Sequence, residues 1–369
     1  MKTYITAIGT ANPLHSLPQA EIGEFMADAL NLQGNERRRL KVLYRASGIQ
    51  SRQSVIEDYG KKNGDFTFFP NTRELEPFPD VADRMALYKD SALDLCVKAA
   101  HRCFEGTNGI ANKDITHIIS VSCTGMYAPG LDIELVEALS LSTHVQRTAI
   151  NFMGCYAAFN ALKVADAICR ADADANVLLV CVELCSIHFQ KKNDDDNLLA
   201  NALFGDGAAA VILTSKPKKG LSLSLENFYC DLAYAGKQEM AWNIGGLGFE
   251  MRLSAYVPDI IKLGIKKLAD NLLQKISLSR KNIDLFAIHP GGKKILETIE
   301  KELGLTRQDN ACAYKVLREH GNMSSPTVLF VLKEIMDGIG IDEEKKNILS
   351  FAFGPGLTME SMLLKSHYN

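Results

Sequence analysis

The chain has 369 residues, of which 47% are hydrophobic and 23% charged, which is ample material for a large core. Its net charge of -3 gives no basic face for nucleic acid, and no stretch reaches the roughly 20 apolar residues of a membrane span. The nine cysteines are scattered without the paired spacing of a zinc site, so we expect a cytoplasmic protein with free thiols and no metal.

Hydrophobic periodicity predicts alternating strands and helices along the first half. The expected elements are a strand over 1–9, helices over 20–32 and 81–104, a strand over 116–122, a helix over 131–141, a short buried strand over 148–152, a helix from 155, a buried strand over 177–182 and a glycine turn into a strand over 201–213. The polar run 191–197 is predicted to be a solvated loop, because its three adjacent carboxylates cannot all face one metal ion.

The second half repeats this plan after a short polar stretch at 215–220. Its expected elements are a helix over 258–276, a strand over 284–289, helices over 293–303 and 324–336, and a closing glycine-turn-strand unit over 347–364. The unit at 353–364 corresponds in position to the one at 204–213. The sequence therefore predicts a duplicated α/β plan, with halves 1–215 and 216–369 forming one pseudo-symmetric unit.

A basic segment follows the first predicted helix. It carries Arg37, Arg38, Arg39, Lys41 and Arg45 around a narrow apolar side. One interpretation is a solvated helix face, which is the usual meaning of a charge run. The other is a docking site for a phosphorylated ligand, since arginine and lysine bind phosphate oxygens well.

Cys155 lies between a predicted strand and a predicted helix, directly after Gly154, which is expected to make a sharp turn. A cysteine at a helix N-terminus meets unpaired N–H groups and the positive end of the helix dipole, which favour the reactive thiolate. The alternative is inert packing, because cysteine is among the most buried residue types.

Two further stretches place reactive groups at the ends of elements. His289 ends a buried strand and is followed by Pro-Gly-Gly, which lets the backbone approach a ligand closely. Asn322 lies in His-Gly-Asn-Met-Ser-Ser just before a helix. Taken singly, the histidine reads as a satisfied core group and the asparagine as a helix cap. Together with Cys155 they form a thiolate, imidazole and amide set that suits covalent acyl chemistry with stabilisation of an enolate or oxyanion.

These motifs resemble the chalcone synthase-like family, the type III polyketide synthases, over nearly the whole chain, with details of its bacterial members. The matching segments are Gly154-Cys155, Leu203–Ala210, Gly246–Phe249, Ile288–Gly292, Gly321–Ser325 and Phe353–Thr358. The resemblance implies a thiolase-like five-layer αβαβα fold, a homodimer, and catalysis without a bound cofactor. The expected substrates are an acyl-CoA starter and malonyl-CoA, joined by iterative decarboxylative Claisen condensation.

The resemblance also assigns roles to single residues. Cys155 would hold the acyl chain as a thioester, and His289 with Asn322 would bind the carbonyl of malonyl-CoA while it loses CO2. Phe204 and Phe249 match the gatekeepers between the CoA tunnel and the cavity. The basic segment, with Arg39, Lys41 and Arg45, falls where the family binds CoA phosphates, although the residue match is loose. Positions expected to shape the cavity are Cys123, Thr124, Cys185, His188, Met240 and Ser324.

The chain departs from the plant enzymes at several of these positions. Plant members have threonine in place of Cys123, Cys185 and His188, and a methionine that crosses the dimer aligns with Ala128, with Met126 nearby. Plant product specificity is therefore not expected to transfer. The starter, the number of extensions and the mode of cyclisation to a pyrone, resorcinol, naphthol or chalcone depend on cavity shape.

The residues of this chain do not fit other enzymes of this fold class, nor one enzyme of another class. Carrier-protein-dependent ketoacyl synthases have asparagine and arginine where this chain has 290–294, and biosynthetic thiolases have a second cysteine where 353–356 has none. A hydroxymethylglutaryl-CoA synthase needs a glutamate base ahead of its cysteine. No glutamate of this chain can be assigned to that position. A papain-like hydrolase also orders Cys, His and Asn with a spacing of about 130–150 residues, but its local cysteine signature is missing. A catalytically silent relative is disfavoured because all three reactive residues are present.

Overall fold

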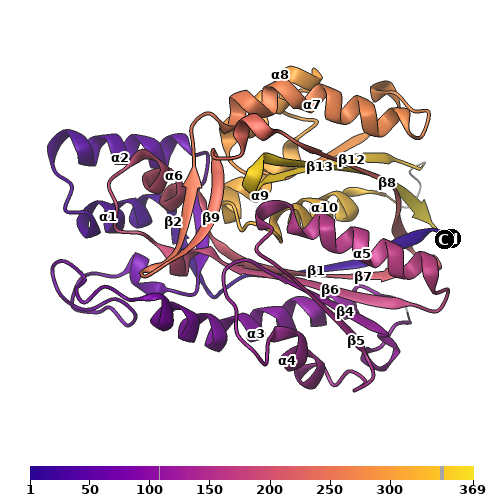
Figure 1. The fold of residues 1–369 in the computed structure, drawn as a ribbon, viewed down its shortest axis with the longest axis horizontal. Helices are drawn as coiled ribbons and strands as arrows, with labels where there is room; N and C mark the ends of the chain where they lie inside the picture. Colours follow the sequence, from indigo (N-terminus) through magenta and orange to yellow (C-terminus); the bar gives the residue numbers. More distant parts are fainter. Residues whose placement is uncertain (108, 341–344) are drawn as a thin grey trace.

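The computed structural model describes residues 1–107, 109–340 and 345–369. Helices and strands alternate in five layers, with helices outside, in the middle and outside again, and strands between them (Figure 1). The α-helices are α1 (Gln19–Ala29), α2 (Gly34–Ala46), α3 (Val81–Glu105), α4 (Leu131–Ala138), α5 (Ala157–Ala171), α6 (Asp195–Leu203), α7 (Val257–Gln274), α8 (Lys293–Leu303), α9 (Ala311–His320) and α10 (Thr327–Gly338).

The strands of both halves belong to one continuous hydrogen-bonded sheet. Among the described residues it has nine strands in the order β11-β12-β13-β8-β1-β7-β6-β4-β5, and β1 joins the halves by pairing with β8. The strands are β1 (Thr3–Ala11), β2 (His15–Pro18), β3 (Ser51–Ser54), β4 (His117–Ser122), β5 (Gln146–Asn151), β6 (Asn176–Leu184), β7 (Asp206–Thr214), β8 (Leu221–Leu232), β9 (Met240–Gly245), β10 (Gly248–Leu253), β11 (Leu285–Ile288), β12 (Asn347–Gly354) and β13 (Thr358–Tyr368).

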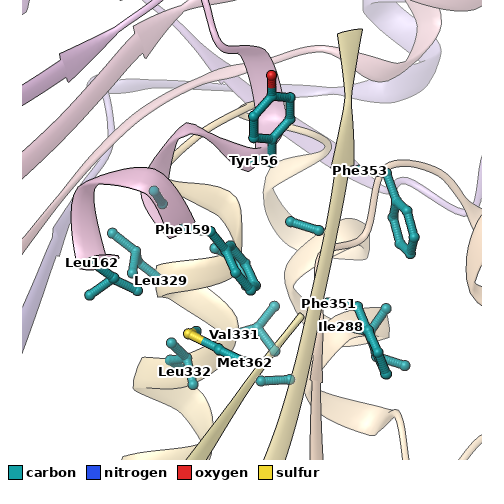
Figure 2. Packing of buried hydrophobic residues seen from close by; sticks show 14 of the residues in the cluster. Tyr156, Phe159, Leu162, Ile288, Leu329, Val331, Leu332, Phe351, Phe353 and Met362 are labelled. Carbon is teal, nitrogen blue, oxygen red and sulfur yellow. The ribbon is translucent and has the colours of Figure 1, made fainter. Parts of the chain in front are cut away.

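Helices α5 and α10 form the middle layer and contact strands of both halves (Figure 1). Figure 2 shows Phe159 and Leu162 of α5 beside Leu329 of α10, all fully buried. Helix α10 buries 7 of its 12 residues and α5 buries 7 of 15, because each is covered by a strand layer above and below. The elements that begin next to Cys155 and Asn322 are thus held together by the centre of the core.

The outer layers cover the opposite faces of the strands. Helices α3 and α4 pack on the first-half strands, α7 packs on the second-half strands, and α8 packs on α7 (Figure 1). Helix α8 is strongly amphipathic, burying Ile295, Leu296 and Ile299 while its lysines and glutamates face outward. Spacings of three and four residues place those apolar side chains on one face. The described residues contain no helix long and apolar enough to cross a membrane.

The structure differs from the sequence-based expectation at two elements. The strand predicted over 148–152 was expected to be buried; that prediction is wrong, because β5 is the edge of the sheet and most of its side chains are exposed. The run 191–197 is a loop only in its first part. Asp194 accepts a hydrogen bond from the Asn197 N–H at 3.0 Å and starts α6. Strands β8, β9 and β10 and helices α6 and α9 were not predicted.

Candidate active site

Cys155 lies in a short 3₁₀ turn, Gly154–Tyr156, between β5 and α5. Gly154 has φ +73°, and a Cβ atom there would lie 2.3 Å from Cδ of Pro355. Only glycine fits this left-handed, crowded position without strain. The turn predicted from the sequence is therefore confirmed, and it brings the second-half residue Pro355 against the loop that carries the thiol.

His289 follows β11 and is buried, and it lines the same cavity as Cys155. Its backbone N–H donates to the Phe351 carbonyl at 2.8 Å, which fixes the chain at the strand end. In the part of the chain that the structure describes, neither ring nitrogen has a hydrogen-bond partner. A buried polar group without a partner is costly and rare. The interpretation of His289 as a satisfied core histidine is therefore wrong, and its nitrogens are available to a ligand.

Asn322 is held by backbone pairing with the segment that carries Phe204. Its N–H donates to the Leu203 carbonyl at 2.9 Å, and its own carbonyl accepts from the Gly205 N–H at 3.0 Å. These bonds fix the amide between the two halves of the chain.

The Asn322 side chain points at the thiol. Nδ2 lies 3.9 Å from Sγ of Cys155 and 3.4 Å from the Gly291 carbonyl. Oδ1 accepts from the Ser324 N–H at 2.8 Å, which fixes the amide, and Oδ1 itself lies 4.0 Å from the sulfur. Asn322 is not the N-cap of α10, because that helix begins after Pro326 without a side-chain cap.

Burial controls the charge state of the two titratable groups. It raises the pKa of the Cys155 thiol to about 11, an effect that hydrogen bonds with the Ser324 and Asn322 side chains partly oppose. It also lowers the pKa of His289 to about 3. Either charge alone is disfavoured in this site, whereas transfer of one proton from Sγ to the imidazole creates two opposite charges that offset each other.

The three residues open into one cavity whose space, including its open mouth, is about 1120 Å³. Its wall is mainly apolar, and among its described residues Arg52 is the only arginine or lysine. The Arg52 guanidinium bonds to Gln19 Oε1 at 2.8 Å and to the Phe204 carbonyl. The structure places on this wall all eight predicted gate and cavity residues: Cys123, Thr124, Cys185, His188, Phe204, Met240, Phe249 and Ser324.

The predicted CoA-binding residues do not line this cavity. Arg39 forms an exposed ion pair with Asp195 at 2.7 Å, and Lys41 forms one with Glu24 at 2.6 Å. Arg45 is exposed on the same helix, α2. Arg39 is nevertheless linked to the cavity wall through Asp195, the first residue of α6, because that helix contributes lining residues.

Glu183 was missed by the sequence analysis. It is fully buried at the end of β6, where one carboxylate oxygen accepts from the Cys123 N–H and the Thr124 hydroxyl, both at 2.9 Å. The other oxygen accepts from the Ser325 hydroxyl at 2.6 Å. Burial raises the pKa of Glu183 to about 7. This carboxyl group ties the first-half loop to the second-half Asn322 segment, and an acidic residue directly after an apolar strand was its only sequence signal.

Comparisons with known proteins assign the family. The sequence profile of chalcone and stilbene synthases, N-terminal domain, matches residues 1–217, and the profile of the C-terminal domain matches 230–367. The chain belongs to the chalcone and stilbene synthase family. This chain is a type III polyketide synthase. Its solved relatives confirm the predicted thiolase-like fold.

Similar proteins of known sequence include two from bacteria and one from a slime mould. The alpha-pyrone synthesis polyketide synthase-like Pks18 of Mycobacterium tuberculosis is 31% identical over 97% of this chain and 90% of its own length. A putative chalcone synthase of Bacillus subtilis is 29% identical, covering 98% of each. Probable polyketide synthase 1 of Dictyostelium discoideum is 30% identical over 99% of this chain, which spans 11% of that much longer protein.

Two solved structures match over nearly full length. The type III polyketide synthase domain of Steely1 from Dictyostelium has a TM-score of 0.90 at 28% identity, covering 99% of both chains. PKS-I from the brown alga Ectocarpus siliculosus also has a TM-score of 0.90, at 30% identity, covering 99% of this chain and 98% of its own.

Proposed function

We propose that this type III polyketide synthase extends an acyl-CoA starter with malonyl-CoA by decarboxylative Claisen condensation, without a bound cofactor. The observation that carries the proposal is the approach of Asn322 Nδ2 to Cys155 Sγ, at 3.9 Å, in a cavity that His289 also lines. The Cys155 sulfur attacks the starter thioester while His289 takes its proton, so that a Cys155 thioester forms and CoA leaves.

The extension step uses the same donors. Asn322 Nδ2 and a His289 N–H bind the thioester carbonyl of malonyl-CoA, whose carboxylate enters an apolar cavity. The Arg52 guanidinium donates to Gln19 and to the Phe204 carbonyl, which are both neutral, and its Nη2 has no hydrogen-bond partner among the described residues. The negative charge of the malonyl carboxylate therefore faces a single arginine or lysine among the described lining residues. Loss of CO2 disperses that charge into an enolate, which the two donors stabilise. The enolate carbon attacks the Cys155 thioester, forming a carbon–carbon bond and releasing the thiol.

One experiment tests the proposed reaction and identifies the class of product. The protein is incubated with malonyl-CoA labelled with ¹³C at the methylene carbon and, in turn, acetyl-CoA, an aromatic acyl-CoA and fatty acyl-CoA starters. Mass spectrometry should detect products with one labelled unit per extension, such as pyrones, resorcinols, naphthols or chalcones. Absence of any labelled condensation product with folded protein and all starters contradicts the proposal.

We also propose that α2 contacts the CoA phosphates. Replacing Arg39, Lys41 and Arg45 together by alanine should raise the KM for CoA thioesters by about fivefold or more with kcat little changed, since exposed ionic contacts are each weak. The control is Lys98→Ala, which removes a similar exposed lysine that is paired with Asp94 on another helix, α3. An unchanged KM in the triple variant would make α2 a plain solvated face.

We further propose that the protein is a homodimer whose interface includes β5. This strand is a sheet edge with exposed side chains, and Met126 nearby is 44% exposed, both of which invite a partner surface. Light scattering should give about twice the 40.6 kDa chain mass, and Ala149→Lys on β5 should lower it. Leu263→Lys on exposed α7 is the matched control. A monomeric wild-type protein would overturn the proposal.

A further inference from the structure

His188 makes two contacts with Phe249, the second predicted gatekeeper, and one with Thr124. Its Nδ1 accepts the backbone N–H of Phe249 at 3.0 Å, and its Nε2 lies 2.7 Å from the Thr124 carbonyl. A carbonyl only accepts, so the ring carries its proton on Nε2 and donates there. The imidazole also stacks on the Phe249 ring, with centroids 4.3 Å apart and planes 8° from parallel. Burial lowers the pKa of His188 to about 3, which keeps the ring in this neutral form.

The hairpin that carries Phe249 is fastened at several other points. Its strands β9 and β10 pair with each other and with no further strand in the described chain. Trp242 Nε1 donates to the Cys123 carbonyl at 2.7 Å, and Gln190 Nε2 donates to the Leu247 carbonyl at 3.0 Å. Gly248 has φ +104°, and a Cβ atom there would lie 3.2 Å from His188 Nδ1. The hairpin tip is therefore seated directly on the histidine.

The Phe249 ring is also restrained by other aromatic side chains. Phe152, just before the catalytic turn, packs on it with ring centroids 5.4 Å apart, and Trp242 contacts it edge-on at 5.8 Å. Phe152 itself has φ +58°, which is uncommon for a bulky residue and places its ring in this position. His188 is the one of these neighbours that holds both the ring and the backbone of Phe249.

We propose that His188 is a positioning residue that latches Phe249 in a fixed place and thereby limits the size of acyl group that reaches Cys155. A side chain that only filled space would not need both ring nitrogens engaged with backbone groups on opposite sides. This inference deepens the proposed function and rests on it for the identity of the acyl group. The narrowing of the passage can be tested independently of condensation.

The test measures passage to Cys155 with two thiol reagents of different size, iodoacetamide and iodoacetanilide. Peptide mass spectrometry gives the alkylation rate of Cys155 for each reagent. The rate for iodoacetanilide divided by the rate for iodoacetamide measures how far the passage to Cys155 admits the larger reagent. The His188→Phe variant keeps an aromatic ring but loses both hydrogen bonds, so the ratio for the larger reagent should rise about fivefold to tenfold. The ratio of kcat/KM for dodecanoyl-CoA over acetyl-CoA should rise in the same direction.

Two further variants show whether His188 acts through Phe249. Asparagine places Oδ1 where Nδ1 was, so His188→Asn should restore the Phe249 N–H contact and bring the ratio part of the way back. In a Phe249→Ala background, His188→Phe should cause no additional change, since the group that it positions is gone. The control is His320→Phe, which also loses a histidine hydrogen bond, to Gln53, and keeps a ring contact, to Phe330.

Each outcome decides the proposal. An unchanged alkylation ratio in folded His188→Phe overturns the latch, as does an equal change in the Phe249→Ala background, which would mean direct contact between His188 and the entering group. If the wild-type protein condenses neither starter, the proposed function fails, while the alkylation ratios still decide whether His188 controls the passage.

Discussion

Replacing Cys155 with alanine is expected to abolish polyketide formation, with a loss of at least about 10⁴-fold in the rate of condensed product. The acyl chain would lose its attachment point beside the Asn322 amide, whose Nδ2 lies 3.9 Å from the Cys155 sulfur. Release of CO2 from malonyl-CoA should continue in this variant, since carbonyl binding by His289 and Asn322 does not require the sulfur. Product mass spectrometry and CO2 release, measured side by side, check both parts.

The matched control for this variant is Cys230→Ala, which removes an exposed cysteine on β8 and should leave product formation at the wild-type rate. Mass spectrometry of the stalled wild-type enzyme should find the acyl group on the peptide that contains Cys155. Wild-type rates of condensation by Cys155→Ala, or an acyl group found on another cysteine, would show that the nucleophile is assigned wrongly.

Replacing His289 with glutamine is expected to slow both chemical steps and to change the pH dependence of Cys155. Burial already raises the pKa of the thiol to about 11 in the wild-type chain, and without the imidazole no His289 cation forms to offset the charge of the thiolate. A raised pKa means less thiolate at pH 7, so alkylation by iodoacetamide should be slower there. Its rate should climb only as the pH rises toward that value. The rate of alkylation from pH 5 to 11 in both proteins measures this shift.

Asn322→Ala provides the comparison for His289→Gln. It removes a donor to the malonyl carbonyl, so CO2 release should fall by about 10²–10³-fold, as for loss of one oxyanion donor. The proton acceptor is still present, so the alkylation profile should move less than in His289→Gln. Identical profiles in wild type and His289→Gln would remove the histidine from proton transfer, and normal CO2 release in both variants would remove it and Asn322 from carbonyl binding.

Several features of the site were predictable because they depend on neighbours in the chain. The turn at Gly154 follows from glycine at a strand-to-helix junction, and the structure shows the left-handed φ that such a turn requires. His289 was placed correctly at the end of a strand, with Gly291 beside it. Buried strands such as β6 were recognisable from continuous apolar runs, since strands covered on both faces show no alternation.

Other features were out of reach because they join residues far apart in sequence. The Glu183 carboxyl group connects Thr124 with Ser325, and His188 bonds to Phe249 although helix α6 and strands β7, β8 and β9 separate them in sequence. The exposure of β5 was predicted wrongly because an apolar run looks the same at the centre of a sheet and at its edge. Whether a second chain covers that edge depends on the surface of the folded chain. The local sequence pattern holds no information about that surface.

The sequence by itself determined the alternation of helices and strands, the duplicated plan and the identity of Cys155, His289 and Asn322 as reactive candidates. These follow from periodicity and from short motifs, which act over a few residues of backbone. Only the tertiary structure decided that the three residues meet in one apolar cavity, and that burial opposes a lone charge on either Cys155 or His289. The physical reason is that desolvation and side-chain contact depend on distance in space, which packing of the two halves sets.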